Sequence, residues 1–183
     1  MQQENIITVT IEPQRYFVEQ LVDSLFRIEC MVPAGLSPET YDPAPVQMTK
    51  LARSKAYFCI GHIGFEEVWM DKLKQNFPQI HFFDNNQGIT LITSEHSHSA
   101  DHSHEHGVDP HIWSSPKAVR LIVQNMYSAL TEIDPTNSNR YVKNLQHLLE
   151  YIDGIDEKIT QTLQNSSQRA FIIYHPEIGR AHV

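Results

Sequence analysis

The sequence predicts an α/β protein made of two Rossmann-like lobes with parallel sheets, joined by a long backbone helix. Two observations lead to this fold class. Short β-branched runs alternate with amphipathic helical patterns over the first 85 residues, an order typical of parallel sheets with right-handed crossovers. One later helical pattern is much longer than a small sheet requires, and another strand pattern follows it.

These patterns divide the chain into unequal parts. Residues 1–134 are expected to form an N-terminal lobe, and residues 135–168 a helix between the lobes. Residues 169–176 are then the first strand of a C-terminal lobe that is mostly missing from this chain. Residues 177–183 resemble a translated DNA sequencing adapter, so we interpret them as a non-native tail and exclude them from the fold.

Four short apolar runs are the expected strands of the first lobe. They cover residues 6–11, 28–32, 56–60 and 80–83. Two helices between them show apolar side chains at three- and four-residue spacing, which indicates one buried face each. The expected buried residues of the first helix are Phe17, Val18, Leu21, Val22 and Leu25, and those of the second are Phe65, Val68, Trp69, Leu73 and Phe77.

Composition limits the classes of partner. Fourteen basic and 22 acidic residues give a net charge of −8, which argues against a nucleic-acid partner because phosphates require a basic surface. No apolar run approaches the roughly 20 residues of a membrane span. The two cysteines, Cys30 and Cys59, lie in apolar runs without a Cys-x-x-Cys motif. We expect both to be small buried hydrophobic residues and not a disulfide.

Histidine is the unusual residue of this composition. Five of the eleven histidines lie within residues 94–107, a segment of His, Ser and acidic residues without apolar periodicity. Such tracts bind zinc, copper or nickel with low selectivity. We interpret the segment as a low-affinity metal-collecting loop, the alternative being an ordinary solvated loop. Its histidines are His96, His98, His102, His104 and His106.

Four further residues are candidate metal ligands because they follow strands or precede a helix. Glu39 lies in a proline-rich loop after the second strand, and His62 lies between two glycines after the third. His111 lies in an Asp-Pro-His-x-Trp segment, and His175 ends the last strand. Singly, each is more often a structural residue. Together, three imidazoles and a carboxylate suit Zn²⁺ better than Mn²⁺, which prefers more carboxylates.

Three motifs resemble those of the zinc- and manganese-specific solute-binding proteins of bacterial ABC importers. Residues 35–45 match the family's Gly-x-Ser-Pro-His-x-Tyr-x-Pro-x-Pro loop, residues 109–113 match its Asp-Pro-His-x-Trp segment, and residues 174–175 begin its Tyr-His-x-Ala strand end. The family has a histidine where this chain has Glu39. The first ligand is therefore Glu39, or His62 replaces it. The region of the family's fourth ligand, usually an Asp, is absent.

The resemblance implies a binding protein and not an enzyme. Such a protein captures Zn²⁺ between two lobes and delivers it to the membrane permease of an ABC transporter. We expect a monomer that acts as a periplasmic protein or a cell-surface lipoprotein, with an export signal that this chain lacks. Two alternatives remain: a metal-dependent hydrolase, for which no His-Glu-x-x-His helix is present, and a metal-binding surface adhesin on the same scaffold.

Overall fold

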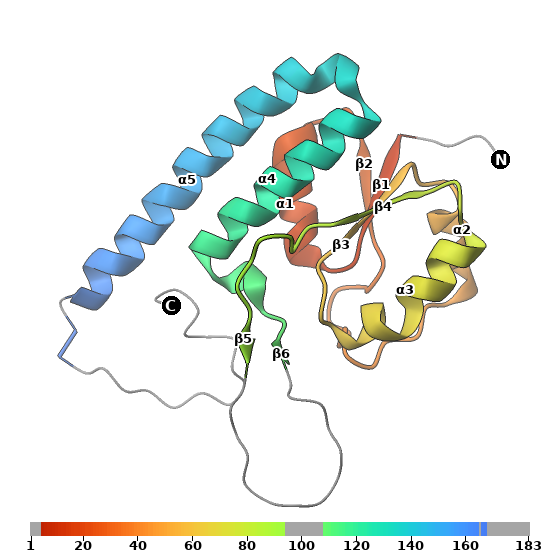
Figure 1. Ribbon diagram of the computed structural model, residues 1–183, viewed down its shortest axis with the longest axis horizontal. Helices are drawn as coiled ribbons and strands as arrows, with labels where there is room; N and C mark the ends of the chain where they lie inside the picture. Colours follow the sequence, from red (N-terminus) through yellow and green to blue (C-terminus); the bar gives the residue numbers. More distant parts are fainter. Residues whose placement is uncertain (1–4, 94–107, 165, 168–183) are drawn as a thin grey trace, which may run out of the picture.

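The computed structural model describes residues 5–93, 108–164 and 166–167, and its centre is a four-stranded parallel sheet (Figure 1). The strand order is β2-β1-β3-β4, and every neighbouring pair is parallel. The predicted α/β class with a parallel sheet is therefore confirmed for this lobe. The strands are β1 (Ile6–Val9), β2 (Arg27–Cys30), β3 (Ala56–Cys59) and β4 (His81–Asp84).

Helices cover both faces of the sheet, as the alternating pattern predicts. Alternate side chains of β3 show the division: Phe58 packs toward one face, whereas Tyr57 and Cys59 pack toward the other. Both faces are thus buried, which explains why the strands read as continuous apolar runs. One layer contains α1 (Glu12–Val22), α4 (Pro116–Ile133) and α5 (Ser138–Gln164), and the other contains α2 (Pro45–Leu51) and α3 (Gly64–Asn76).

The two cysteines are free, as predicted, but only Cys59 is buried as expected, whereas Cys30 is partly exposed. Cys30 lies on β2 and Cys59 on β3, and β1 separates these strands in the sheet. Burial raises the pKa of the Cys30 thiol to about 12, with the neighbouring Glu12 carboxylate adding to the effect. Burial also raises the pKa of the Cys59 thiol, so both side chains remain protonated at neutral pH.

The predicted buried face of α3 is wrong at one position. Phe65 and Leu73 are buried as expected, but Val68 is 57% exposed and Met70 is buried in its place. Five residues along a helix of 3.6 residues per turn rotate a side chain by about 140°. Val68 consequently lies on the side of α3 opposite to Leu73, and its apolar character alone does not indicate burial.

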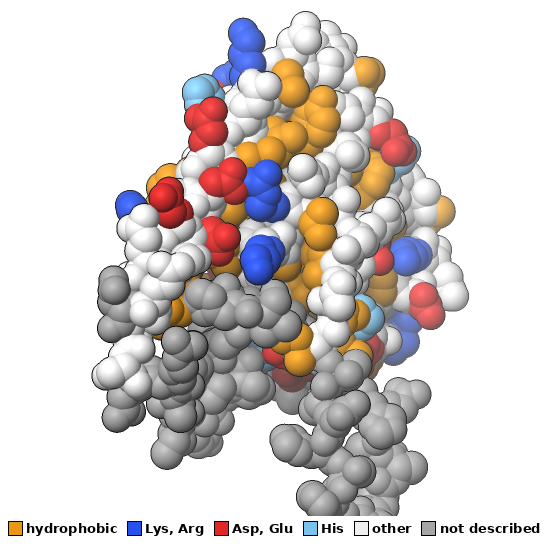
Figure 2. Space-filling view, turned by 60° about the vertical axis from the view of Figure 1, so that its left-hand side comes forward, with side chains coloured by type: hydrophobic (Ala, Val, Ile, Leu, Met, Phe, Trp, Pro, Cys, Tyr) orange, Lys and Arg blue, Asp and Glu red, His pale blue; other side chains and the backbone are white. Residues whose placement is uncertain are grey.

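The long helix expected within residues 135–168 is present as α5, which covers Ser138–Gln164. Its 27 residues span about 40 Å, and its first half packs on α1 and α4 through Tyr141, Leu145, Leu148 and Ile152. Farther along, Ile155 and Leu163 are exposed. Figure 2 shows hydrophobic side chains in patches among charged ones on the side of the molecule that carries α5. That α5 connects two lobes remains a prediction.

A short antiparallel pair of strands, which the sequence did not predict, flanks the His-rich segment. β5 (Ile92–Thr93) pairs with β6 (Val108–Asp109), so the residues on either side of 94–107 are neighbours in this pair. β6 leads directly into the predicted ligand His111 and the short 3₁₀ helix η1 (Ile112–Ser114). A second 3₁₀ helix, η2 (Pro135–Asn137), joins α4 to α5.

Several predictions lie outside the described residues. They concern the histidines of the His-rich segment, the last strand with His175, and the tail 177–183, and they remain predictions. Among the helices of the described ranges, none is long and apolar enough to cross a membrane.

A buried tyrosine links the ends of α4 and α5. Tyr141 is fully buried, and its Oη donates to Asp134 Oδ2 at 2.5 Å. The amide of Asn137 donates to the same oxygen at 2.8 Å. Partial burial acts to raise the pKa of Asp134, but the hydrogen bonds from Tyr141 and Asn137 outweigh it and lower the pKa below its ordinary value.

Tyr141→Phe should therefore lower the free energy of unfolding by about 1–2 kcal/mol at pH 7. A carboxyl with a lowered folded-state pKa stabilises the fold above its unfolded-state pKa and loses that effect as pH falls through the folded-state pKa. The difference between wild type and variant should accordingly narrow below about pH 4. Urea denaturation at pH 7 and below about pH 4 tests this, with Tyr151→Phe as control because Tyr151 is exposed. An equal difference in the free energy of unfolding between wild type and Tyr141→Phe at the two pH values would contradict it.

Candidate metal centre

A cleft of about 370 Å³ lies where β1 and β2 end, and it brings together two of the predicted ligands, Glu39 and His111. The carboxyl ends of parallel strands are where open α/β sheets bind ligands. Three segments line the cleft: the start of α1, the loop after β2, and the turn before α4. Their lining residues are Ile11, Glu12, Pro13, Val32, Pro33, Ala34, Gly35, Leu36, Ser37, Pro38, Glu39, His111 and Trp113.

The side chain of Glu39 is held at the N-terminus of α3. The backbone N–H of Gly64 donates to Glu39 Oε2 at 2.9 Å, and the N–H of Phe65 donates to the carbonyl oxygen of Pro38 at 2.9 Å. The first N–H groups of a helix lack partners within the helix and carry a partial positive charge, so a carboxylate is stabilised there. These two bonds fix both the loop and the direction of the Glu39 carboxylate.

Gly64 allows this close approach because it has no side chain. A Cβ atom at position 64 would lie 2.4 Å from the carbonyl oxygen of Glu39 and 3.0 Å from its Oε2. The first distance is far shorter than a van der Waals contact and involves backbone that cannot rotate away. The contact between the loop and α3 therefore depends on glycine at this position.

His111 is buried and oriented by a neighbouring carboxylate. Its side chain contacts Asp109, whose Oδ1 lies 2.7 Å from His111 Nδ1 and also accepts the backbone N–H of His111 at 3.0 Å. The Trp113 ring packs edge-on against the imidazole, with 5.1 Å between centroids. When Nδ1 donates to Asp109, the neutral ring carries its lone pair on Nε2. Such a carboxylate–histidine pair is the usual support of a metal-binding imidazole.

His62 lies in a different place from Glu39 and His111. It has a φ of 58° in the turn after β3 and is exposed. It lines a separate pocket of about 240 Å³, together with Lys74 of α3 and Asp84 of β4. The structure thus brings two of the predicted ligands into one cleft and places His62 outside it.

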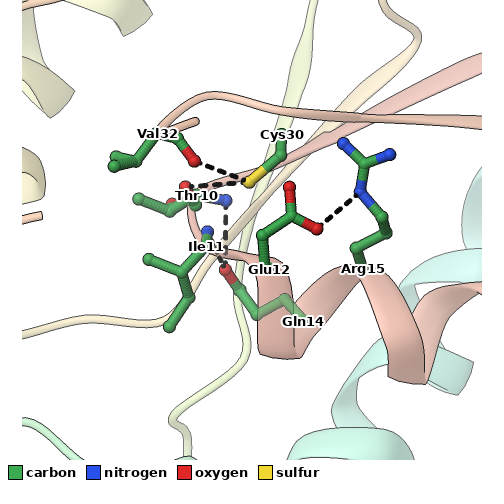
Figure 3. Close-up of polar contacts among 7 residues, drawn as sticks. All are labelled: Thr10, Ile11, Glu12, Gln14, Arg15, Cys30 and Val32. Atoms are coloured by element: carbon green, nitrogen blue, oxygen red, sulfur yellow. Dashed lines mark hydrogen bonds and ion pairs between the residues drawn. The ribbon is translucent and has the colours of Figure 1, made fainter. Parts of the chain in front are cut away.

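The sequence reasoning missed Glu12 as a residue of the cleft. It is the first residue of α1, with two residues between it and the end of β1, and it lines the same cleft as Glu39 and His111. Its Oε2 pairs with Nε of Arg15 at 3.0 Å, as Figure 3 shows. The sequence does contain a signal for Glu12, because an acidic residue near the carboxyl end of a parallel strand is well placed for a ligand site.

Gln14 fixes the chain at the inner wall of the cleft. Its Oε1 accepts the backbone N–H groups of Thr10 at 3.0 Å and Ile11 at 3.2 Å (Figure 3). Its Nε2 donates to the carbonyl oxygen of Phe58 on β3 at 2.9 Å. This buried amide therefore ties the end of β1 and the first turn of α1 to the neighbouring strand.

The described part of the cleft has fewer candidate donors than a zinc site usually has. Within residues 5–93, 108–164 and 166–167, no group of three or more His, Cys, Asp or Glu side chains could hold a metal ion. Zn²⁺ usually takes four ligands. Glu39 and His111 can supply an oxygen and a nitrogen, and further donors have to come from elsewhere.

Comparison with known proteins decides the family. The family described as ZnuA, zinc-uptake complex component A periplasmic, matches residues 7–180 of this chain. The chain belongs to this family. The resemblance predicted from the three motifs is thereby confirmed.

Solved structures of this family share the fold. A crystal structure of ZnuA is 35% identical in sequence, with a TM-score of 0.85. The match covers 98% of this chain and 66% of the ZnuA chain. A zinc-bound ZnuA lacking residues 138–173 of its own sequence is 34% identical, with the same TM-score and 65% of its chain covered.

Curated relatives are considerably longer than this chain. The high-affinity zinc uptake system protein ZnuA of Bacillus subtilis is 24% identical over 180 residues, which are 94% of this chain and 56% of that protein. A putative metal-binding protein of Chlamydia trachomatis is 28% identical over 169 residues, with 92% and 58% covered. The chain thus spans a little more than half the length of these relatives.

Proposed function

We propose that this chain is the zinc-capturing part of an extracytoplasmic solute-binding protein that delivers Zn²⁺ to the permease of an ABC transporter. The observation that carries the proposal is the cleft that contains both Glu39 and His111, at the ends of parallel strands. The support of His111 by Asp109 adds to it, because metal-binding imidazoles usually have such a partner. Membership of a periplasmic zinc-uptake family supports the direction of transport and the location.

The proposed ligands are Glu39 through a carboxylate oxygen, His111 through Nε2, and His175 from the second lobe. Glu39 is favoured over His62 as the first ligand because Glu39 lies in the same cleft as His111, whereas His62 lines another pocket. Zinc is favoured over manganese because two of these three donors are imidazoles.

The His-rich segment is proposed as a collector beside this site. The β5–β6 pair flanks this segment in the sequence, and β6 contains Asp109, the partner of His111. Weak binding by the loop histidines would raise the local zinc concentration near the cleft. The zinc-binding lipoprotein AdcA of Streptococcus pneumoniae, 22% identical over 178 residues, supports a periplasmic or cell-surface location.

Glu39→Ala should lower the zinc affinity at least about tenfold, because loss of even an outer-shell partner of a metal ligand costs about 10–100-fold. Competition with a chromophoric zinc chelator measures the affinity. Glu67→Ala is the matched control, since Glu67 is an exposed glutamate in the first turn of α3. Equal affinities of the two variants would overturn the proposed role of Glu39.

A further inference from the structure

A glutamate is buried behind the turn that connects β3 to α3. Glu66 is only 6% exposed, and its carboxylate accepts the backbone N–H groups of Ile60 at 2.9 Å and Gly61 at 2.7 Å. The Thr10 hydroxyl, at the end of β1, also donates to it and lies 2.9 Å from the Tyr57 hydroxyl. Burial raises the pKa of Glu66, while these three hydrogen bonds act to lower it.

A carboxylate is costly to bury, so this arrangement calls for a structural reason. The hydrogen bonds offset the loss of water, yet an apolar side chain of similar size would fill the space without that cost. What an apolar side chain could not do is bind two successive backbone N–H groups. The contacts of Glu66 therefore point to control of the backbone at Ile60 and Gly61.

The turn that Glu66 binds has an uncommon backbone conformation. Gly61 has a φ of 83° and His62 a φ of 58°. Positive φ is rare for a residue with a side chain, because it brings the side chain close to the backbone and is energetically unfavourable. The turn ends at Gly64, the residue whose N–H donates to the Glu39 carboxylate. Glu66 thus binds the start of the segment 60–64, and the last residue of that segment orients Glu39.

We infer that Glu66 is a positioning residue for the zinc cleft: it fixes the turn 60–64 and, through the Gly64 N–H, the carboxylate of Glu39. The part of this inference that concerns zinc rests on the proposed function. The part that concerns the backbone does not, because it can be measured without any metal.

Amide hydrogen exchange of the metal-free chain tests the backbone part. In Glu66→Gln, the exchange at Gly61 and Gly64 should be at least about tenfold faster. The N–H groups of Ile60 and Gly61 bind different oxygens of the Glu66 carboxylate, and an amide has an NH₂ donor in place of one of these oxygens. Exchange at Met31, whose N–H donates to the carbonyl oxygen of Val9 at 2.8 Å, should be unchanged. Glu67→Gln is the matched control. Unchanged exchange at Gly64, or equal acceleration at Met31, would overturn the inference.

A second variant keeps the test decisive should Glu66→Gln not fold. Thr10→Val removes one donor to the carboxylate and preserves the shape of the side chain. It should accelerate exchange at Gly61 and Gly64 in the same direction but by a smaller factor. A folded Thr10→Val variant with unchanged exchange at both glycines would overturn the inference.

Zinc affinity in a double-mutant cycle tests whether Glu66 acts through Glu39. Glu66→Gln should weaken zinc binding about tenfold in the otherwise native chain but less than about twofold in the Glu39→Ala background. Equal losses in both backgrounds would overturn the inference. If Glu39→Ala itself does not change the affinity, the proposed function fails, and the exchange measurement still decides the role of Glu66 in the turn.

Discussion

Replacing His111 with alanine should lower the zinc affinity at least about 100-fold, which is the largest effect that the proposed site predicts. The variant removes a ligand nitrogen and leaves Asp109, which now lies 2.7 Å from the ring, without its imidazole partner. Loss of an outer-shell partner alone costs up to about 100-fold, so loss of the ligand should cost at least as much. Chelator competition measures the difference.

His147→Ala is the matched control for this variant. The His147 side chain is 82% exposed on α5, and it is not among the residues that line the cleft. Circular dichroism should show that both variants are folded, because losing the hydrogen bond to Asp109 costs His111→Ala about 1–3 kcal/mol. A folded His111→Ala variant that binds zinc as His147→Ala does would contradict the assignment of His111 as a ligand.

Gly64→Ala should lower the zinc affinity at least about tenfold and the free energy of unfolding by about 1–3 kcal/mol. The added Cβ would meet the carbonyl oxygen of Glu39 at 2.4 Å, so the loop that carries Glu39 has to move away from α3. That movement also lengthens the hydrogen bond from the Gly64 N–H to the carboxylate. Chelator competition and urea denaturation measure the two effects.

Gly154→Ala makes the same chemical change where there is room for it. A Cβ at position 154, within α5, would have no neighbour within 4 Å. This control should keep native zinc affinity and gain up to about 1 kcal/mol of stability, because alanine favours a helix interior over glycine. Native zinc affinity in Gly64→Ala would contradict the proposed contact between α3 and the metal-binding loop.

The strands were predictable because both faces of the sheet are buried, which makes each strand a compact apolar run. The antiparallel pair β5–β6 was not predictable, since two residues per strand produce no periodicity. Val68 shows a further limit: an apolar residue beside a buried stripe fits a sequence pattern although its side chain points away.

Glu39 could be placed at the cleft from the sequence because it follows a parallel strand, and the carboxyl ends of such strands are where open α/β sheets bind ligands. His111 follows the antiparallel strand β6 and was indicated by its Asp-Pro-His-x-Trp motif. The argument from strand ends fails for His62, whose turn has a positive φ and leads to a separate pocket. Glu66 could not be predicted at all. A glutamate on an amphipathic helix usually faces water, and its burial depends on Thr10, which is 56 residues away in the sequence.

The most direct test of the zinc site is an anomalous difference map at the zinc edge from crystals of the zinc-loaded protein. If the cleft binds zinc, a peak should lie within about 2.0–2.2 Å of both a Glu39 carboxylate oxygen and His111 Nε2. A zinc peak confined to the histidines of residues 94–107, with none in the cleft, would contradict the proposed zinc site.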